Sequence, residues 1–523
     1  MLSEPSHRDD SVAIQQRLYV LRIMESLRVN GTRPAIHWRH GTISAGEFHH
    51  CVRAMAAALR HNGVGAGDIV AVLTSPNHPK LLSTRYAAHL LGAAVVHIRS
   101  MNPRTDAETF SFATQAGLLR GIGARMLVVD EANAERGRAL AGEMTDLTVL
   151  NDDGGTGAAS GDATVEEWAT AQRYSPDDLA VIDFTSGSTG GPKMVQQPFG
   201  TWEARIAMLS PSYAQEPPAT LLSVTPVCHT TAPMADAVLS HGGTVVLHEG
   251  FHAGAVLDAV AVHGITDVYL AVPYLYWLVE HPGTAHANLS SLRRVIYSGT
   301  PAAPARITQA AEVFKDALIQ VYGTTEAGGI TSLSPLDHLE PELLGSVGRP
   351  VPWVRVELRD PRSDTLAAPG EVGEVCVTSP TLMGSYRGQS DLTARVLREG
   401  RLRTGDLGRW DAYGYLHLIG RVGDVIKSGG LKLDPVLIER TLLAHPQVKN
   451  ATVYGVRDED YVEHVHAAVE LRPSADCGVE DLRAHVASAL SSVHVPEDVT
   501  VWDELPLLAS GKPDHAFLRS RNG

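Results

Sequence analysis

The sequence has few of the features that mark several common protein classes. It contains 4 cysteines among its 523 residues, and no two of them form a CxxC pair. This usage offers no thiolate metal site, is typical of a reducing compartment, and predicts four small buried hydrophobes. No apolar run approaches the length of a membrane span, and the acidic start does not resemble a signal peptide. We therefore expect a soluble, cytoplasmic protein without a membrane span.

Positive charge is also scarce, because the formal net charge is -15 at pH 7. Nucleic acids and anionic membranes bind through an excess of Lys and Arg, so neither is expected as the main partner. A hydrophobic fraction of 44% and a charged fraction of 20% are typical of an ordinary globular chain. A chain of this length predicts two to four structural units.

Helix-like and strand-like segments alternate along the first part of the chain. Residues 45–64 have the pattern of an amphipathic helix, residues 67–75 that of a buried strand, and residues 80–98 repeat the pair. This alternation predicts the α/β class, with a large N-terminal domain of layered, mostly parallel sheets and a β-rich subdomain from about residue 350. A small, mobile α+β domain is expected at the C-terminus. The predicted boundaries are 1–423 and 424–523.

The segment FTSGSTGGPK (184–193) directly follows the apolar strand pattern DLAVIDF. Glycines let a backbone approach an anion closely, hydroxyl groups add donors, and a lysine adds positive charge, so the segment is a candidate phosphate loop. It does not match the Walker pattern, because Pro192 precedes Lys193 and Met194 follows it. A plain surface loop is the alternative interpretation.

Three further segments carry candidate ligand-binding residues. VYGTTEAGG (321–329) offers an aromatic face, threonine hydroxyls and a carboxylate for magnesium, although a plain strand end and turn has the same pattern. Asp406 suits ribose hydroxyls and Arg421 suits phosphate or ribose, although a simple hairpin is the alternative. Lys512 lies in the glycine-flanked LPLLASGKPD and could move onto developing negative charge, although the segment taken alone favours an ordinary solvated lysine.

The four segments, in this order, resemble the adenylate-forming superfamily of acyl- and aryl-CoA ligases, and the resemblance covers nearly the whole chain. It implies that a carboxylate attacks the α-phosphate of ATP to give an acyl-adenylate and pyrophosphate, and that a nucleophile then captures the acyl group. ATP, Mg²⁺ and CoA are the implied cofactors. The catalytic residues implied by the family motifs are Lys512, Thr325 and Glu326, with Glu326 also the metal ligand.

The same resemblance implies the remaining site residues. Those that bind ATP would be Thr185, Ser186, Gly187, Ser188, Thr189, Gly190, Lys193, Ser298, Gly299, Thr300, Pro301, Tyr322, Gly323, Thr324, Asp406 and Arg421. Tyr322 would stack on adenine and Asp406 would hold the ribose. The small domain would rotate about a hinge at Asp424, so that Lys512 serves adenylation and Gly429 and Gly430 serve thioester formation.

The acid and the acceptor stay open at this stage. His229, Tyr274 and Trp277 are the candidate acid-binding residues, with ordinary core packing as the alternative. Their chemistry favours an aryl, alicyclic or fatty acid without an α-amino group. The chain resembles a stand-alone ligase that transfers the acyl group to CoA. The alternatives are transfer to an amine or to a partner protein, or a nucleotide-binding protein without catalysis, and a homodimer is compatible with the resemblance.

Overall fold

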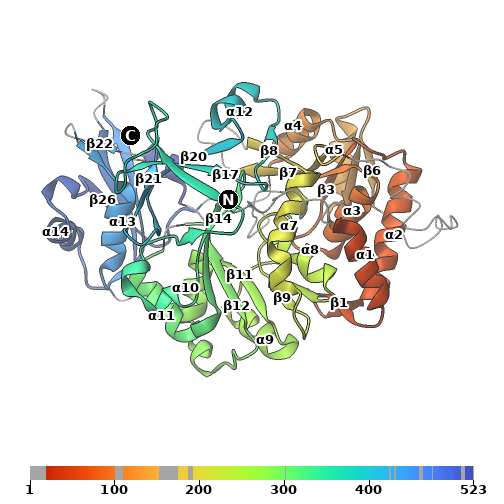
Figure 1. Ribbon diagram of the computed structural model, residues 1–523, viewed down its shortest axis with the longest axis horizontal. Coiled ribbons are helices and arrows are strands. Elements are labelled where there is room, and N and C mark those ends of the chain that lie inside the picture. The colour runs from red at the N-terminus through yellow and green to blue at the C-terminus, as the bar shows by residue number, and fades with distance from the viewer. Residues whose placement is uncertain are drawn as a thin grey trace, which may run out of the picture. The chain divides into compact units, whose positions relative to one another are not determined.

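The computed structural model describes residues 19–99, 110–151, 175–185, 193–300, 302–422, 426–428, 431–458, 463–473, 475–507 and 513–521. The chain divides into two compact units. The first comprises 1–100, 109–250 and 383–387, and the second comprises 101–108, 251–382 and 388–523. Each unit is described by itself, with the element labels of Figure 1.

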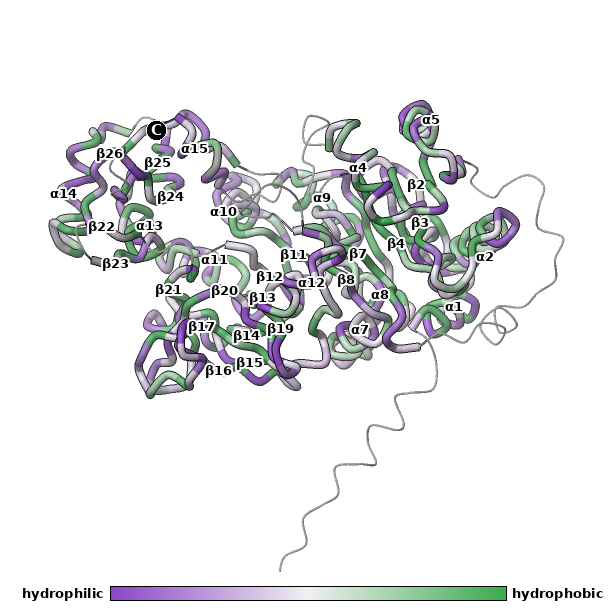
Figure 2. Tube along the Cα trace, turned by 90° about the horizontal axis from the view of Figure 1, so that it is seen from above, coloured by the Kyte–Doolittle hydropathy of each residue, from purple (hydrophilic) through white to green (hydrophobic). Residues whose placement is uncertain are grey.

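A seven-stranded sheet forms the centre of the first unit, in the order β18-β8-β7-β4-β3-β5-β6. Its strands are β3 (Ile69–Leu73), β4 (Ala94–His97), β5 (Met126–Val129), β6 (Thr148–Leu150), β7 (Leu179–Thr185), β8 (Lys193–Pro198) and β18 (Ser385–Tyr386). The strands from β7 to β6 run parallel, whereas β8 and β18 are antiparallel additions. Every residue of β3, β4 and β5 is buried, as expected for parallel strands covered on both faces, and β3 and β4 are green in the hydropathy view (Figure 2).

A second group of strands in this unit has the order β9-β10-β1-β2, with only β2 antiparallel. The strands are β1 (Pro34–Trp38), β2 (Gly41–Ser44), β9 (Thr220–Ser223) and β10 (Thr244–Leu247). The α-helices among the described residues of the unit are α1 (Tyr19–Val29), α2 (Ala45–His61), α3 (Pro79–Leu90), α4 (Phe112–Ile122), α5 (Ala134–Gly142), α7 (Phe199–Tyr213) and α8 (Ala232–Ser240). Helix α2 begins at a capping box between Ser44 and Glu47, which satisfies its first backbone donors.

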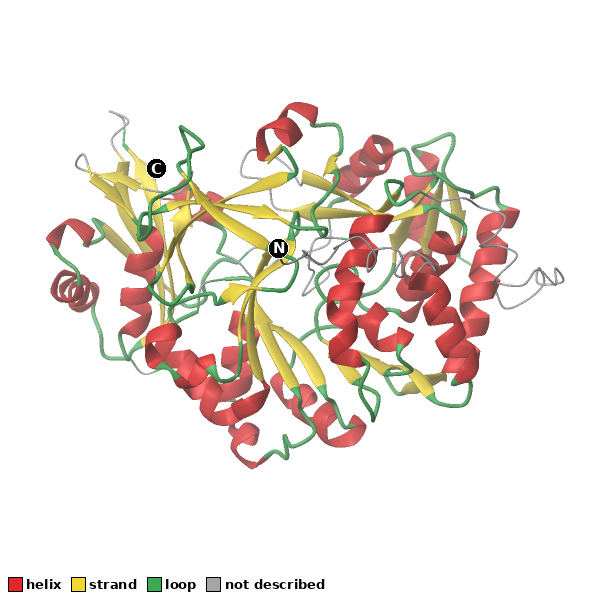
Figure 3. Ribbon diagram, viewed as in Figure 1, coloured by secondary structure: helices red, strands yellow, loops and turns green. Residues whose placement is uncertain are grey.

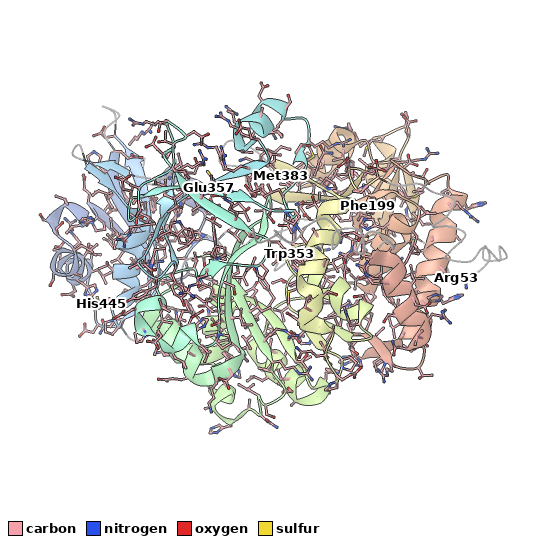
Figure 4. The ribbon with its side chains drawn as sticks, in the orientation of Figure 1. Arg53, Phe199, Trp353, Glu357, Met383 and His445 are labelled. Atoms are coloured by element: carbon pink, nitrogen blue, oxygen red, sulfur yellow. The ribbon has the colours of Figure 1, made fainter. Side chains whose placement is uncertain are left out.

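A fully buried ion pair joins two helices of the first unit. Arg85 on α3 contacts Asp236 on α8, and neither side chain is exposed. The Tyr86 hydroxyl and the Trp202 indole N–H also donate to the Asp236 carboxylate, over 2.7 and 3.0 Å. Because Arg85, Tyr86 and Trp202 together compensate the buried charge of the Asp236 carboxylate, the ion pair holds α3 against α8. Phe199, the first residue of α7 and labelled in Figure 4, has its ring centre 4.9 Å from that of His89 on α3.

The second unit begins with five strands in the order β15-β14-β13-β12-β11. These strands are β11 (Asp267–Ala271), β12 (Arg294–Ser298), β13 (Leu318–Thr324), β14 (Gly328–Leu333) and β15 (Arg349–Pro350), and the helices beside them are α9 (Ala253–His263), α10 (Val272–Glu280) and α11 (Pro304–Phe314). β11 to β13 run parallel, and β14 and β15 continue the sheet antiparallel. The parallel part follows the βαβ pattern predicted from the alternation of segments.

An antiparallel sheet follows, in the order β16-β17-β20-β19 with β21 also paired to β20. Its strands are β16 (Arg355–Arg359), β17 (Gly373–Thr378), β19 (Leu397–Arg398), β20 (Arg401–Trp410) and β21 (Leu416–Arg421), and the short helix α12 (Ser390–Val396) precedes β19. This sheet is the β-rich part expected after about residue 350.

The C-terminal segment builds an α+β layer around a separate core. It contains β22 (Ile426–Ser428), β23 (Leu431–Leu433), α13 (Pro435–Ala444), β24 (Val448–Arg457), β25 (Glu463–Leu471), α14 (Val479–Ala489), β26 (Asp498–Trp502) and α15 (His515–Arg521) (Figure 3). Apolar side chains of α13 and α14, among them Ile438, Leu442 and Val486, pack on the three-stranded sheet β24-β25-β26. Contacts of Glu280 with Arg306 and Arg472 link this layer to α10 and α11.

The fold class predicted from the sequence is confirmed: mixed α/β sheets with a β-rich part and a small C-terminal α+β domain. The boundary predicted at Asp424 lies outside the described residues and stays a prediction. The cysteine prediction is only partly right, because Cys228 and Cys376 are buried whereas Cys51 and Cys477 are partly exposed. Across the part of the chain that the structure describes, no helix is long and apolar enough to cross a membrane.

Candidate active site

The candidate phosphate loop is framed by an antiparallel hairpin. β7 ends at Thr185 and β8 begins at Lys193, and these two residues are register partners. The two ends of the candidate loop therefore lie side by side in the sheet. Lys193 is half-buried, with its ammonium 5.5 Å from the centre of the Tyr386 ring. The predicted loop residues between these ends, namely Ser186, Gly187, Ser188, Thr189 and Gly190, lie outside the described residues.

Two other predicted segments meet within the second unit. The Tyr322 hydroxyl on β13 donates to Oδ2 of Asp406 on β20, over 2.7 Å. Arg421, at the end of β21, places Nε 2.9 Å from Oδ1 of the same carboxylate. The hairpin β20–β21 produces this pair, because Asp406 and Arg421 are direct register partners. The structure thus brings together the residues predicted to bind adenine and ribose.

This cluster has a graded exposure. Tyr322 is buried, Asp406 has a side chain 15% exposed, and Arg421 is 56% exposed at the rim. Burial, followed by the charge of Asp406, holds the pKa of Tyr322 well above its usual range, so its hydroxyl stays a hydrogen-bond donor. The carboxylate has two oxygens with further acceptor capacity, which suits the vicinal hydroxyls of a ribose.

The turn between β13 and β14 carries the predicted catalytic residues Thr325 and Glu326. Gly323 is required at its base, because a Cβ there would lie 2.3 Å from the carbonyl oxygen of Gly328. The Ala327 N–H donates to the Thr324 hydroxyl over 3.1 Å, which closes the turn. Both Thr325 and Glu326 are half-buried in this turn.

Glu326 suits a magnesium ion that is also held by other groups. Among the described residues, no cluster of three or more His, Cys, Asp or Glu side chains could hold a metal ion. Mg²⁺ usually binds one or two protein carboxylates and completes its octahedron with water and substrate phosphates. A single protein carboxylate therefore fits this ion, and Glu326 would be that ligand.

The segment predicted to run beside adenine follows β12. Ser298 is its last strand residue, and Gly299 adopts a φ of 106°, which side chains other than glycine rarely allow. No atom of the described residues lies within 4 Å of the position that a Cβ of Gly299 would occupy. Thr300 follows, half-buried, and Pro301 lies outside the described residues. The backbone here is open to close approach by a planar group.

His229 lies in the turn between β9 and α8, and buried side chains fix that turn. The Asn77 amide donates to the carbonyl of Thr225 over 3.0 Å, and its oxygen accepts from the N–H of Val227 over 2.9 Å. Arg85 donates to the carbonyl of Val227 over 2.8 Å. The His229 side chain is 24% exposed, and its Nδ1 lies 3.7 Å from Oδ1 of Asp183 on β7.

Tyr274 and Trp277 form an aromatic cluster on α10 of the second unit. Phe251, which precedes α9, stacks on Tyr274 with the rings 4.5 Å apart and nearly parallel. Trp277 lies 5.6 Å from Tyr274 and 6.1 Å from Phe251. Tyr274 is buried whereas Phe251 and Trp277 are half-buried, so the cluster presents partly accessible aromatic surface.

Several predicted residues are not placed. Asp424, Gly429, Gly430 and Lys512 lie outside the described residues, so their predicted roles stay predictions. The flanking strands β22 and β23 are antiparallel partners.

Sequence reasoning missed Asp183 and Phe251. A carboxylate within the apolar strand DLAVIDF was an available signal for Asp183, whereas no pattern in the sequence separates Phe251 from an ordinary core aromatic.

The Tyr322–Asp406–Arg421 cluster lies where the sequence predicts contacts with adenosine, and comparison with known proteins identifies the class of enzyme. The model of the family described as AMP-binding enzyme matches residues 24–387, and that of the AMP-binding enzyme C-terminal domain matches residues 437–512. The chain belongs to this family. It is of the acyl- and aryl-CoA ligase type, the AMP-forming class of ATP-dependent ligases that was predicted from its motifs.

Three similar proteins show how far the likeness extends. The chain is 31% identical to the medium/long-chain-fatty-acid–CoA ligase FadD8 of Mycobacterium tuberculosis, over 95% of this chain and 89% of that protein. It is 33% identical to a feruloyl-CoA synthase of an Amycolatopsis species, over 93% and 95%. Among solved structures, the amide bond synthetase McbA from Marinactinospora thermotolerans matches with a TM-score of 0.86 and 34% identity, over 96% of this chain and 99% of that one.

Proposed function

We propose that the protein activates a carboxylic acid with ATP to an acyl-adenylate, releasing pyrophosphate, and then transfers the acyl group to CoA. The observation that carries the first step is the convergence of Tyr322, Asp406 and Arg421, because it supplies a buried aromatic, a ribose acceptor and a rim cation in one place. Lys193 and Thr185 would hold the phosphates from the base of their loop. Thr325 and Glu326 would hold the α-phosphate and Mg²⁺.

Lys512 would complete adenylation by bridging the acid and the α-phosphate. A cation placed there stabilises charge that grows in the transition state, and its withdrawal leaves room for the acceptor. Lys512 is the last residue of the segment that the C-terminal family model matches. Rotation about Asp424 would then bring Gly429 and Gly430 to the second step.

The acid is proposed to be aryl, alicyclic or fatty and to lack an α-amino group. The segment that carries His229 contains a single aspartate, Asp236, and that carboxylate is fully buried against Arg85. It therefore has no capacity to receive a substrate ammonium. The stacked Phe251–Tyr274 pair and Trp277 favour a flat or apolar substrate.

CoA is the preferred acceptor because the curated relatives reported above are named for CoA thioester formation. The specific observation in favour of a second candidate, transfer to an amine, is the likeness to an amide bond synthetase at 34% identity. The imidazole of His229 is compatible with either acceptor.

Two measurements test the proposal together. ATP–pyrophosphate exchange with a panel of aryl, alicyclic and fatty acids reports adenylation, and mass spectrometry of mixtures offered both CoA and simple amines identifies the acceptor. Acid-dependent exchange with formation of an acyl-CoA is the expected result. Exchange followed by amide formation alone would select the second candidate. A lack of exchange with every acid would instead favour a nucleotide-binding protein without catalysis.

A further inference from the structure

Asp183 is a buried carboxylate whose position the proposed roles above leave unexplained. It lies on β7, two residues before the end of the strand at Thr185, and its side chain is 5% exposed. Most of its neighbours on the strand are apolar, so an aspartate here costs desolvation energy. Burial is the largest influence on its pKa and raises it, whereas the charges of His229, Arg205 and Arg85 act in the opposite direction.

Two contacts orient this carboxylate. The amide of Gln197, on the adjacent strand β8, donates a hydrogen bond to it, and Oδ1 faces Nδ1 of His229 over 3.7 Å. That distance exceeds a hydrogen bond and corresponds to an electrostatic contact. Such contacts between catalytic groups are often long in the absence of substrate. The carboxylate is thus held from one side and aimed at an imidazole on the other.

The turn that carries the His229 imidazole is also held in place by hydrogen bonds. These bonds involve Asn77 and Arg85, and the His229 ring is partly exposed whereas Asp183 is enclosed behind it. A carboxylate that faces Nδ1 from the protein side favours a proton on that nitrogen and leaves Nε2 as the acceptor. The arrangement has the geometry of a base oriented by a third group.

From this geometry we propose that Asp183 is a positioning residue for the second half-reaction, which holds His229 so that Nε2 receives the proton of the acceptor. The inference rests on the proposed function. In the step itself, the S–H bond of CoA breaks and a C–S bond forms at the acyl carbon. The C–O bond to the phosphate of AMP breaks, AMP leaves with the electron pair, and the proton passes to His229. Asp183 stabilises the imidazolium that results.

Other titratable groups surround the Asp183–His229 pair. His97, at the end of β4, is buried, and neither of its ring nitrogens has a hydrogen-bond partner among the described residues. Burial holds the pKa of His97 well below its usual range, so it adds no charge. Arg85 and His89 face it from α3, and Arg205 approaches Asp183 from α7. Asp183 is therefore the carboxylate that faces His229, and the other groups around the pair are imidazoles and guanidinium groups.

The test separates the two half-reactions. Transfer from a chemically prepared acyl-adenylate to CoA is followed in a single turnover from pH 6 to 9, and ATP–pyrophosphate exchange is measured with the same acid. For Asp183→Asn we expect transfer to fall at least about tenfold further than exchange, since general-base assistance contributes roughly 10²–10⁴-fold. The midpoint of the pH profile should also move to lower pH, because the charge that stabilises the imidazolium is lost.

A double-variant comparison excludes a merely structural role. If Asp183 acts through His229, Asp183→Asn combined with His229→Gln should transfer no more slowly than His229→Gln alone. If the losses in transfer rate caused by the two single substitutions multiply in the double variant, the inference is overturned. The matched control is Asp130→Asn, a buried aspartate directly after β5 of the same sheet whose partners are Ser75 and Asn133, and it should leave the ratio of transfer to exchange unchanged.

Two outcomes keep this inference distinct from the proposed function. A wild-type enzyme that exchanges with no acid refutes the proposed function, whereas normal exchange and unimpaired transfer in Asp183→Asn refute the positioning role alone. If Asp183→Asn loses exchange through misfolding, Asp183→Glu replaces it. A Glu variant that keeps the wild-type pH midpoint supports the role of the charge, and one whose midpoint moves to lower pH although the carboxylate is retained overturns it.

Discussion

Arg421 and Asp406 are paired directly across the β20–β21 hairpin, with Nε of Arg421 2.9 Å from Oδ1 of Asp406. The arginine is more than half exposed, so the pair adds little to stability. Its effect is to orient the carboxylate, whose other oxygen accepts from Tyr322. A carboxylate aligned by two partners can present its remaining lone pairs in a fixed direction.

Asp406→Asn should therefore weaken nucleotide binding more than it weakens the fold. Removal of a charged acceptor costs about 1.5–3 kcal/mol, so we expect the KM for ATP in the exchange reaction to rise about tenfold or more. The KM for the acid should change far less. Asp411→Asn, at the other end of the same hairpin, is the matched control, because Asp411 bonds the backbone of Tyr413 and Tyr415. An equal rise in both variants would assign the effect to hairpin stability.

Lys512→Ala should separate the two half-reactions. Acid-dependent pyrophosphate release should be abolished, because the cation that stabilises the adenylation transition state is lost. Capture of a presynthesised adenylate by CoA should stay largely intact. Separate assays of pyrophosphate release and of acyl-CoA formation measure the two steps. Equal loss of both steps would contradict the proposed movement of the C-terminal domain.

Trp277→Ala should impair acid binding through the aromatic cluster on α10. With the partly exposed ring removed, we expect the KM for an aryl acid to rise about tenfold, or ~1.4 kcal/mol, with the KM for ATP little changed. Trp353→Ala is the matched control, because Trp353 is 56% exposed on a loop of the same unit (Figure 4). A comparable loss in the control, or no loss in Trp277→Ala, would show that the cluster is ordinary core.

Glu439 on α13 predicts a pH-dependent stability. Burial raises its pKa from the ordinary 4.5 to about 7, although its carboxylate accepts from Thr452 and from the N–H of Val453, each over 2.8 Å. A carboxyl group whose pKa rises on folding is neutral in both states at low pH. It destabilises the fold as pH rises from about 4.5, and the penalty is complete above about 7, at no more than ~3 kcal/mol.

Glu439→Gln should consequently raise the thermal midpoint at pH 8, and the gain should shrink as the pH falls toward 5. The amide oxygen of glutamine still accepts from Val453, so packing is preserved. Glu480→Gln on α14, where the side chain is 88% exposed, is the control and should show no such dependence. A gain that is independent of pH would rule out ionisation of Glu439 as its source.

Local sequence patterns were sufficient to predict the helix at 45–64 and the strand at 67–75. The helix predicted at 45–64 begins at Ala45 and ends at His61, because the Asn62–Gly63 step, with Gly63 at a φ of 79°, stops it early. The strand predicted at 67–75 is β3, and its continuous burial explains why its sequence is wholly apolar. Hydrophobic periodicity and glycine positions carry this information within a few residues.

Local sequence patterns could not predict which side chains meet in the folded protein. Tyr322 and Asp406 are 84 residues apart, and Asp183 faces His229 across different elements. The interpretation of residues 402–421 as a hairpin was offered as an alternative to a binding role, and the structure shows the hairpin itself creating the Asp406–Arg421 pair. Phe251 was missed for the same reason, since its stacking on Tyr274 depends on how α9 and α10 pack.

The buried pair of Arg85 and Asp236 also restricts how this chain can evolve. Loss of either partner alone leaves a charge enclosed without compensation, at a cost of about 3–5 kcal/mol, which is a large fraction of the stability of most domains. Loss of both together, with apolar replacements of similar volume, carries no such penalty. We therefore expect sequences that descend from this one to keep both residues or to replace both.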